Sequence, residues 1–504
     1  MTPEQEQIAK LTQKVEEQAE IIDYLTKKLY GKKSEQVDAN QLSLLEEDDG
    51  VFTEPEQTGQ ENQANQVQSA KKRKKTRQEV LSPNLPIKRT VIDVAAKQCP
   101  HGHRLVFVGE KFIREQLHFQ PAKLYREEIY THTYKCIDCE AIDGLTRLIQ
   151  GLVPKPVIPH SLGSASVIAE IIHQKFEQGV PLSRQLKEWQ RMGAQLSETT
   201  LANWVIKSGE MMAPLYNLIR EELVAQPYLQ GDETPMQVLR EPGKAATSKS
   251  YMWVMRSVRK SSKQAVQYAY GDTRSGAFAE NLYRGFTGVL QCDGYAGYNG
   301  LDNSVIRVGC FAHVRRKFYE AASVNGKIIM SRPLKLLDEM FALEKEWKQW
   351  SPRSRRRQRQ RLLLKLVRKF WSWIDQADEL PKSRLGKAIT YARNQRIALN
   401  RVLNYGAIDF SNNASERNMK SFVIGRKNWL FSTSPAGAKA TAIWMTLIES
   451  AKANGINPRD YVTYLLNEVP QLPDFAKKED LEAYLPWNYQ SGLDNREEFH
   501  VIAA

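Results

Sequence analysis

Three acidic residues of the chain follow predicted secondary-structure elements in a way that could bring them into one site. Asp232 directly follows the predicted strand 228–230, and Asp293 follows the predicted strand 288–291, so both carboxylates are expected at strand ends of one sheet. Glu416 begins a helical stretch and could complete the site. Mg²⁺ prefers oxygen ligands such as carboxylates. Two such ions about 3.5 to 4 Å apart activate an attacking oxygen and stabilise a leaving one, so the chemistry would be phosphodiester cleavage.

Each of the three acids also has an ordinary structural explanation. Asp293 and the glycine after it form a turn dipeptide, and Asp232 precedes a Glu-Thr-Pro sequence that is typical of a turn. Glu416 stands at the third helical position of a capping box that would begin at Asn413. On spacing alone these explanations are favoured over a catalytic one, because acids at such intervals arise by chance in a chain of this size. The surrounding residues must therefore decide.

The elements that would position the acids form a mixed sheet followed by helices. Apolar, β-branched and aromatic runs predict strands in the segments 228–230, 251–258, 264–270, 288–291 and 305–310. A strongly helical stretch follows at about 334–404 and looks inserted before Glu416. Its segment SRRRQRQRLLLKLVRKFW is basic on one side and apolar on the other, which favours a DNA-facing helix over a membrane-surface helix.

The residues around the acids resemble a known family. LQGDETPMQVL, QCDGYAGYNGL, VGCFAHVRRKF, SNNASERNMKSFVIGRKNWLFS and the closing DYVTYLLNEVP…LPWN are similar to successive blocks of the insertion sequence 66 family of transposases. The resemblance runs nearly end to end and includes LYGKKSEQ and LSLLEE after the first helix, the cysteine module and the PLSRQ…LANW segment. Several motifs in the right order are far more specific than any one of them.

The resemblance implies an RNase H-like catalytic core with a DDE triad, interrupted by an α-helical insertion between the second and third acids. The family's acids fall on Asp232, Asp293 and Glu416, which would hold two Mg²⁺ ions, with Mn²⁺ as the alternative. The chemistry would be hydrolysis at the element's ends, followed by attack of the freed 3′-hydroxyl on target DNA. No covalent protein–DNA intermediate is needed, so Tyr295 and Tyr298 are not proposed as nucleophiles.

Further residues of these blocks could grip phosphates or stack on a base near the cut, although some of them will be structural. These candidates are His313, Arg315, Arg316, Lys317, Arg417, Arg426, Lys427 and Trp429. One departure from the family stands beside Glu416, because Ser411 occupies the place where members often carry Asp, and Asp409 lies two residues earlier.

The cysteine module predicts a structural zinc site. Cys136 and Cys139 have the two-residue spacing that lets both thiolates reach one tetrahedral Zn²⁺. The resembling family has a second such pair upstream, but here Gly102 stands at its second cysteine, so the preferred ligand set is Cys99, His103, Cys136 and Cys139. His101 is the rival ligand, and a degenerate finger that folds without metal is the alternative. Cys292 and Cys310 lie on predicted strands as small buried hydrophobic residues.

Two other segments point to self-association and DNA binding. Apolar residues recur every seven positions from Ile8 to Leu29, which predicts a short coiled coil, with an amphipathic helix packed on its own domain as the alternative. The stretch 182–205 has the outline of a helix-turn-helix, with a turn at Gly193 and Ser197 as N-cap of the second helix. Such outlines also occur in ordinary helical domains, so Arg184 and Lys207 could face DNA or only solvent.

The bulk properties agree with a nucleic-acid partner. The chain has 504 residues, a formal net charge of +14 and a pI near 9.3, which favours a polyanion. It lacks an apolar run long enough to span a membrane and a secretion signal, so we expect a bacterial cytoplasmic, nucleoid-associated protein. Expected partners are terminal inverted repeats, target DNA, a second copy of the chain and small accessory proteins of the same element. A DNA-binding protein without catalysis and another metal-dependent nuclease on the same fold are the alternatives.

Together these features predict a multidomain α/β protein. Its expected parts are a coiled-coil oligomerisation helix (1–37), a flexible charged linker (38–86) with the basic run KKRKKTR, a zinc-finger-like β module (87–150), a helical helix-turn-helix-like DNA-binding region (151–225), an RNase H-like catalytic domain (226–450) with a helical insertion at about 330–405, and a C-terminal tail domain (451–504).

Overall fold

The computed structural model describes residues 124–136, 147–150, 153–259, 261–324, 327–328 and 330–492. The elements discussed below belong to the larger of two compact units of the chain, which includes Glu127–Ala504. The predicted coiled coil, the linker with its basic run, and the predicted zinc ligands Cys99, His103 and Cys139, with the rival His101, lie outside the described residues.

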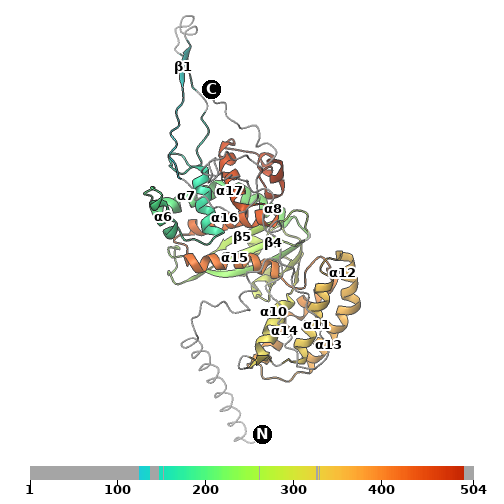
Figure 1. Ribbon diagram of the computed structural model, residues 1–504. Coiled ribbons are helices and arrows are strands. Elements are labelled where there is room, and N and C mark those ends of the chain that lie inside the picture. Colours follow the sequence, from blue (N-terminus) through green and yellow to red (C-terminus); the bar gives the residue numbers. More distant parts are fainter. Residues whose placement is uncertain are drawn as a thin grey trace, which may run out of the picture. The chain divides into compact units, whose positions relative to one another are not determined.

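The centre of this unit is a five-stranded mixed sheet with the order β5-β4-β3-β6-β7 (Figure 1). Its strands are β3 (Tyr228–Gln237), β4 (Lys249–Ser257), β5 (Val266–Gly271), β6 (Gly288–Gln291) and β7 (Val305–Val308). β3, β4 and β5 pair antiparallel, whereas β6 runs parallel to β3 and β7 parallel to β6. The mixed sheet expected from the sequence is confirmed.

β3 is longer than the sequence predicted. The strand continues to Gln237, so Asp232 lies inside it rather than after it. The Glu-Thr-Pro sequence is not a turn, because Pro235 pairs with Tyr251 of β4. β6 pairs with β3 only at residues 228–230, so beyond Gln230 no strand of the described residues pairs with this side of β3. Proline is tolerated where a strand has such a free side.

Within the described residues, four helices precede the five-stranded sheet. They are α5 (Ala165–Phe176), α6 (Leu182–Arg191), α7 (Glu198–Met211) and α8 (Ala213–Val224). Ser197 caps α7 as predicted, its side chain accepting from the N–H of Thr200 at 3.1 Å, and Gly193 takes a left-handed φ of 99° in the turn. α7 packs on α16 (Pro435–Ala453), where Trp444 Nε1 donates to the carbonyl of Val205 at 3.1 Å.

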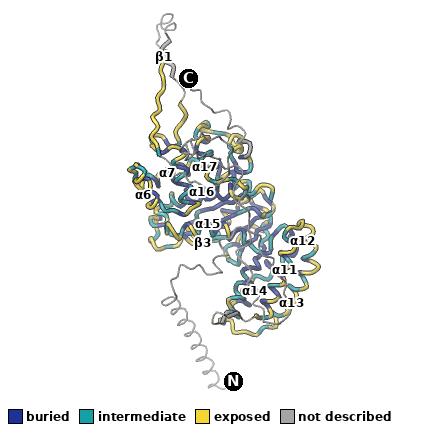
Figure 2. The backbone as a smooth tube through the Cα atoms, viewed as in Figure 1, coloured by how far each residue is buried: buried dark blue, intermediate teal, exposed yellow. Residues whose placement is uncertain are grey.

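A second group of helices fills the chain between β7 and α15 (Asn413–Trp429). These helices are α10 (Phe311–Ala322), α11 (Arg332–Glu346), α12 (Pro352–Gln358), a π-helical turn (Arg359–Leu363), α13 (Leu364–Gln376) and α14 (Arg384–Arg401), ending in a 3₁₀ turn (Val402–Asn404). Their shared core includes the buried side chains of Phe318, Leu337, Phe370 and Trp371. Figure 2 colours the backbone by burial and shows buried and exposed stretches alternating along these helices. The helical stretch expected here is therefore present.

The basic segment of these helices is not wholly on the surface. Arg355 and Arg359 are buried and share the buried carboxylate of Glu344 on α11. Arg359 Nε lies 2.6 Å from Glu344 Oε1, and its Nη1 donates to the carbonyls of Val402 and Tyr405 at 3.0 and 2.7 Å. The expectation of a DNA-facing segment is therefore wrong for these two arginines. Their contacts instead connect α11, the π-helical turn and the end of the inserted helices.

Smaller elements complete the described fold. They are β1 (Thr133–Cys136) paired with β2 (Arg147–Gln150), α9 (Gly276–Leu282), the pair β8 (Ser323–Val324) and β9 (Lys327–Ile328), α17 (Pro458–Glu468), α18 (Lys478–Glu482) and 3₁₀ turns at Ala296–Gly300, Val469–Gln471 and Pro486–Gly492. Within the described residues of the predicted β module (87–150), the strands are Thr133–Cys136 and Arg147–Gln150. Among the described helices, none has the length and apolar character needed to cross a bilayer.

α16 covers the outer edge of the sheet with two hydroxyl groups. The backbone N–H of Val266 donates to Ser450 Oγ at 3.0 Å, and that of Tyr268 donates to Thr446 Oγ1 at 2.9 Å. Ser450 Oγ also donates to the carbonyl of Val266 at 2.9 Å. A free strand edge offers unpaired N–H and C=O groups to other chains, so α16 closes the edge of β5.

Removing these hydroxyls should destabilise the protein. We expect Thr446→Val and Ser450→Ala each to lower the free energy of unfolding by about 1 to 3 kcal/mol, because each leaves a buried backbone group without a partner. Urea unfolding measures the effect. Thr463→Val is the control, since Thr463 Oγ1 donates to the carbonyl of Arg459 on the side of α17 that water reaches, and a loss as large as at residue 446 would refute edge closure.

Candidate active site

The first two acids occupy equivalent positions on neighbouring parallel strands. Gln230 of β3 pairs with Gln291 of β6, so Asp232 and Asp293 each stand two residues beyond this pair in the same direction. Asp293 leaves the end of β6 in a short turn, in which its Oδ1 accepts from the N–H of Tyr295 at 2.9 Å. Asp293 therefore lies in the turn that the sequence predicted and also at the position that corresponds to Asp232.

Asp232 lies within the electrostatic reach of both other predicted acids. Burial raises its pKa well above the usual range, and the negative charges of Glu233, Glu416 and Asp293 raise it further. A hydrogen bond from the N–H of Glu233, at 2.9 Å, acts in the opposite direction. Like charges that are held together in this way favour either a proton or a bound cation.

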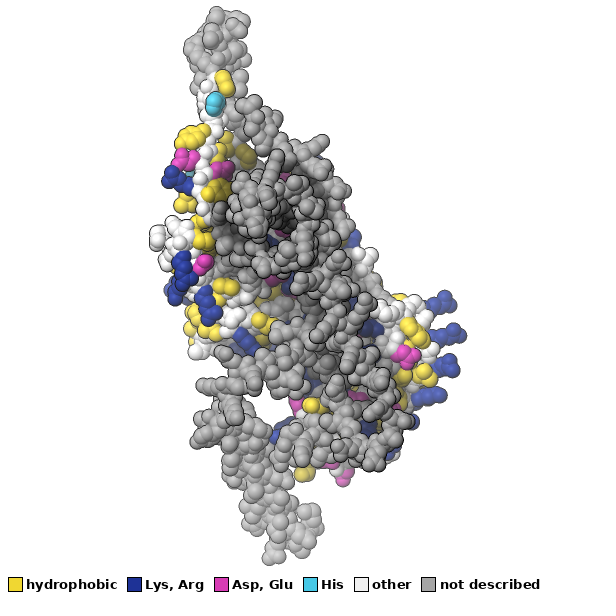
Figure 3. Space-filling model, viewed as in Figure 1, with side chains coloured by type: hydrophobic (Ala, Val, Ile, Leu, Met, Phe, Trp, Pro, Cys, Tyr) yellow, Lys and Arg dark blue, Asp and Glu magenta, His cyan; other side chains and the backbone are white. Residues whose placement is uncertain are grey.

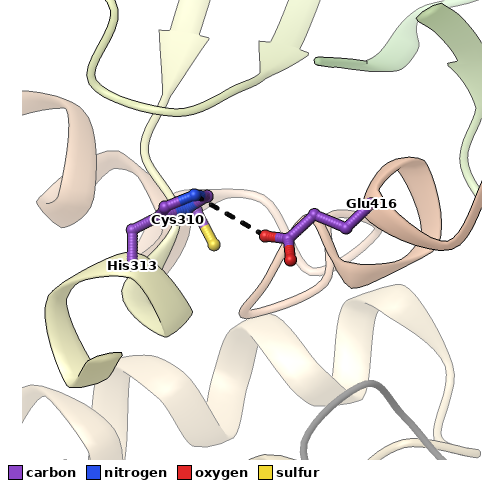
Figure 4. Close-up of side chains that lie close together, drawn as sticks. All are labelled: Cys310, His313 and Glu416. Atoms are coloured by element: carbon purple, nitrogen blue, oxygen red, sulfur yellow. Dashed lines mark ion pairs between the residues drawn. The ribbon is translucent and has the colours of Figure 1, made fainter. Parts of the chain in front are cut away.

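Glu416 approaches from the first turn of α15, where basic groups of α10 meet it. Arg316 Nη2 donates to Glu416 Oε2 at 3.1 Å, and His313 Nε2 lies 3.7 Å from Glu416 Oε1 (Figure 4). Asn412, the N-cap residue, forms no side-chain cap, so the proposed capping box is absent. The carboxylate of Glu416 therefore faces the site rather than its own helix end.

The beginning of α15 is held by the sheet. Arg256 of β4 donates through Nη1 to the carbonyl of Ala414 at 3.1 Å and to Asn418 Oδ1 at 2.6 Å. Asn418 in turn donates through Nδ2 to Glu449 of α16 at 2.6 Å. Burial is the main cause that lowers the pKa of Arg256 to about 10, which still leaves it charged at neutral pH. These contacts fix the turn of α15 that carries Glu416.

Two buried glutamines, each two residues before one of the acids, form a hydrogen-bonded pair. Gln230 Nε2 donates to Gln291 Oε1 at 2.7 Å, and Gln291 Nε2 donates to the carbonyl of Asp409 at 2.6 Å. Asp409 Oδ1 accepts from Arg355 Nη1 of the inserted helices at 3.2 Å. The pair thus connects both acid-bearing strands to the segment that leads to Glu416. Sequence reasoning missed this pair, and the polar residue two positions before each acid, in an otherwise apolar strand, was the available signal.

Of two further groups near the acids, the sequence analysis missed Glu233 and predicted Cys310 only as a small buried hydrophobic residue, which its burial confirms. The carboxylate of Glu233 is fully buried and accepts from Arg274 Nε at 2.9 Å and from Tyr298 Oη at 2.6 Å, so it is already neutralised. Cys310 lies with His313 and Glu416 in a group whose ligand atoms are within 4.8 Å of one another. It lies beyond the end of β7, and the Cys-x-x-His spacing could have revealed it.

The oxygen atoms of this site fit a divalent cation. Glu416 Oε1 is buried and makes no hydrogen bond, and Asp232 is held beside other carboxylates at a cost in charge repulsion. Hard carboxylate oxygens gathered in this way are the donors that Mg²⁺ and Mn²⁺ take. Burial raises the pKa of Cys310 to about 12, and its sulfur accepts from the N–H of Asn412 at 3.4 Å, so this thiol is a neutral packing group.

Comparison with protein families adds an independent observation to this geometry. Residues 160–440 match the model described as "Transposase IS66 family", which covers more than half of the chain and includes all three acids. The chain belongs to the IS66 transposase family. Residues 17–90 match "Transposase C of IS166 homeodomain", residues 96–140 match "zinc-finger binding domain of transposase IS66", and residues 446–487 match "IS66 C-terminal element". A transposase role follows, and the resemblance noted in the sequence is confirmed.

Relatives of this IS66-family chain occur in Sinorhizobium fredii. The uncharacterized protein y4qI is 30% identical over 365 residues, which are 69% of this chain and 67% of that protein. The uncharacterized protein y4jD is 28% identical over 490 residues, which are 93% of this chain and 94% of that protein. The similarity to y4jD therefore extends over nearly the whole length of both proteins.

The residues predicted to contact DNA divide into two groups in this IS66-family fold. Arg315 is buried against Asp338 at 2.7 Å, and Trp429 packs on Phe176 with Lys175 Nζ 4.7 Å from its ring, which favours structural roles. The others lie nearer the acids or face solvent. His313 and Arg316 contact Glu416, Lys317 lies over the Tyr391 ring, Arg426 donates to Thr234, and Arg417 and Lys427 are exposed.

The raised pKa of Asp232, caused first by burial and then by the neighbouring carboxylates, predicts a pH effect on stability. Its folded pKa is above the value of about 3.9 expected in the unfolded chain, so its stabilising contribution is complete below that value and is lost as pH rises through the folded pKa. We expect metal-free Asp232→Asn to be about 1 to 3 kcal/mol more stable than wild type near pH 8, with a smaller difference near pH 5. Thermal melting in EDTA measures this. Added Mg²⁺ should raise the melting temperature of wild type only, and equal shifts in both proteins would contradict the prediction.

Proposed function

We propose that the chain is an active DDE transposase that cuts DNA at the terminal inverted repeats of its element and joins the freed 3′ ends to target DNA. The observation that carries this proposal is the meeting of Asp232, Asp293 and Glu416, which come from two parallel strands and a helix far apart in the sequence. The sheet order β5-β4-β3-β6-β7, with three antiparallel strands and two parallel ones, supports an RNase H-like core.

Asp232, Asp293 and Glu416 would hold two Mg²⁺ ions, which when bound supply activation of the attacking oxygen and stabilisation of the leaving oxygen. The protein's own part is to position these carboxylates. The Gln230–Gln291 pair keeps the two strands in register behind the acids, and Arg316 and His313 orient Glu416. No side chain is needed as a covalent nucleophile, and the hydroxyl of Tyr298 is occupied by Glu233.

The remaining parts of the proposal concern assembly on DNA. The N-terminal heptads would join two copies of the chain, so that both ends of an element can be held together. Cys99, His103, Cys136 and Cys139, with His101 as rival, would bind one structural Zn²⁺ in the segment 96–140. The exposed Arg417 and Lys427, with Lys317, would contact phosphates near the cut. Small accessory proteins of the element and a cytoplasmic, nucleoid-associated location belong to the same proposal.

The test is cleavage and joining of a labelled duplex that carries the element's ends. Wild type should cut and join in Mg²⁺, cut and join in Mn²⁺, and do neither in EDTA. Cleavage without joining would replace the proposal with a metal-dependent nuclease. Binding without cleavage in any of these conditions, including after addition of the element's accessory proteins, would replace it with a DNA-binding protein that lacks catalysis.

A further inference from the structure

The outer side of α12, the π-helical turn and α13 carries a regular row of cations. Arg353, Arg357, Arg361, Lys365 and Arg368 are all exposed and follow one another at intervals of four, four, four and three residues. Residues with this spacing lie on one side of a helix. We call these five residues the α12–α13 basic face. In Figure 3, lysine and arginine side chains project from the edge of the molecule where these helices lie.

The charge of this face is not neutralised within the protein. Between Trp347 and Ile374 the sequence contains no Asp or Glu, and within the described residues none of the five cations forms an ion pair. The two arginines on the inner side behave differently, since Arg355 and Arg359 are both paired with Glu344. The basic segment therefore has an inner side whose positive charges are paired with Glu344 and an outer side whose positive charges have no acidic partner in the described residues. An uncompensated row of like charges favours a polyanionic partner.

We propose that the α12–α13 basic face binds the sugar-phosphate backbone of duplex DNA, at a surface separate from the three acids. A helix rises about 1.5 Å per residue, so the face is roughly 22 Å long and presents a cation about every 6 Å. Phosphates of one DNA strand rise about 3.4 Å along the duplex axis, so successive cations match about every second phosphate. Contacts of this kind position a protein on DNA without reading its sequence.

Other polyanions fit the face less well. An amphipathic helix that enters a membrane surface needs an exposed apolar side, but Leu363, Val367, Phe370 and Trp371 are buried in the core of the inserted helices. Binding of single strands depends on exposed aromatic rings that stack on bases. On this segment the ring of Trp371 is covered by Arg396 at 4.9 Å, and Trp373 packs on Phe318. The partly exposed Trp350, just before α12, packs on Trp347. Duplex DNA, held by phosphate contacts alone, is therefore the partner that the face favours.

The inference rests on the proposed function for the choice of DNA over other duplex polyanions, but its test needs no chemistry. The test variant is Arg357→Gln with Arg361→Gln and Arg368→Gln in the full chain. The matched control is Arg332→Gln with Lys335→Gln and Lys345→Gln, which removes three exposed cations from α11 of the same helical group, beside acidic neighbours such as Glu339 and Glu346. Circular dichroism and thermal melting should be unchanged in both.

Binding is measured by fluorescence anisotropy with a labelled duplex of random sequence, in buffer without Mg²⁺ or Mn²⁺ and over a range of salt concentrations. We expect the test variant to bind about 10- to 100-fold more weakly than wild type at low salt, and its plot of log K against log salt to be less steep by up to about 2.7, because each phosphate contact contributes about 0.9. The control should bind within about threefold of wild type, since scattered surface charges make no defined contacts.

Several results would overturn the inference. Equal losses in the test and control variants would mean that net charge, not this face, attracts the DNA. Unchanged binding by the test variant would mean that the α12–α13 basic face does not bind DNA. Loss of binding to a single strand or to phosphatidylserine vesicles, with duplex binding retained, would assign the face to that partner instead. Because binding is measured without Mg²⁺ or Mn²⁺ and involves no cleavage, a failed cleavage test would overturn the proposed function but would not decide the result for the α12–α13 basic face.

Discussion

Asp293→Asn should lower the rate of DNA cleavage by at least about a thousandfold while leaving DNA binding intact. The substitution keeps the size of the side chain and the oxygen that accepts from the N–H of Tyr295, so the turn after β6 should persist. What it removes is the negative charge beside Asp232 and Glu416, on which cation binding depends. Single-turnover cleavage of labelled element ends in Mg²⁺ measures the rate, and anisotropy in EDTA measures binding.

A matched control for this substitution lies in the same region of the chain. Asp302 Oδ1 accepts from the N–H of Ser304 at 2.8 Å, which reproduces the local geometry of Asp293, but Asp302 is exposed and lies away from the other acids. Asp302→Asn should cleave at the wild-type rate. Asp232→Asn and Glu416→Gln should behave like Asp293→Asn. Retained cleavage in Asp293→Asn, or loss of folding in all three variants, would remove the triad assignment.

Glu344→Gln should lower the free energy of unfolding by about 3 to 5 kcal/mol. The buried carboxylate of Glu344 accepts from Arg359 at 2.6 and 2.8 Å and from Arg355 at 3.1 Å, and both guanidinium groups are themselves buried. The amide would leave Arg359 without a counter-charge and Arg355 with only the partly exposed Asp409. Because Arg355 also contacts Asp409, whose carbonyl accepts from Gln291, we expect the affinity for Mg²⁺ to fall as well. Urea unfolding and a metal titration measure the two effects.

The control is an ion pair of the same type that water reaches. Arg396 Nη1 contacts Asp375 at 2.8 Å in the same group of helices, but both side chains are more than two-fifths exposed. Asp375→Asn should therefore cost less than about 1 kcal/mol. If Glu344→Gln costs no more than Asp375→Asn, the buried cluster does not hold the inserted helices together.

Much of the fold could be predicted from local sequence patterns. The alternating apolar and aromatic runs marked all five strands, and Ser197 and Gly193 marked the break between α6 and α7, because turns and caps depend on neighbours in sequence. β3 was predicted too short, since the Thr234-Pro235 pair is typical of a turn. Only the pairing of strands, which brings β4 beside one side of Pro235 and no strand beside the other, decides that it continues the strand.

The site was predictable in part for a similar reason. The three acids could be chosen from the motifs around them, but Gln230, Gln291 and Glu233 acquire their roles from partners tens to more than a hundred residues away. The zinc ligands, the coiled coil and the DNA contacts remain predictions. The spacing of residues could have predicted which arginines of the basic segment are buried, because Arg355 and Arg359 lie on the same helix side as Leu363 and Val367. The net charge of the segment does not distinguish them from the exposed cations.

The hydroxyls of Thr446 and Ser450 on the edge of β5 also set a minimum useful length for the chain. A copy interrupted after Glu416 but before Thr446 would still encode all three acids, yet its β5 would end in an open row of N–H and C=O groups. Such edges pair with one another, so the shortened protein should aggregate rather than occupy DNA ends in competition with the intact enzyme. Because a shortened protein would lack this segment, it would not compete with the intact protein for DNA ends.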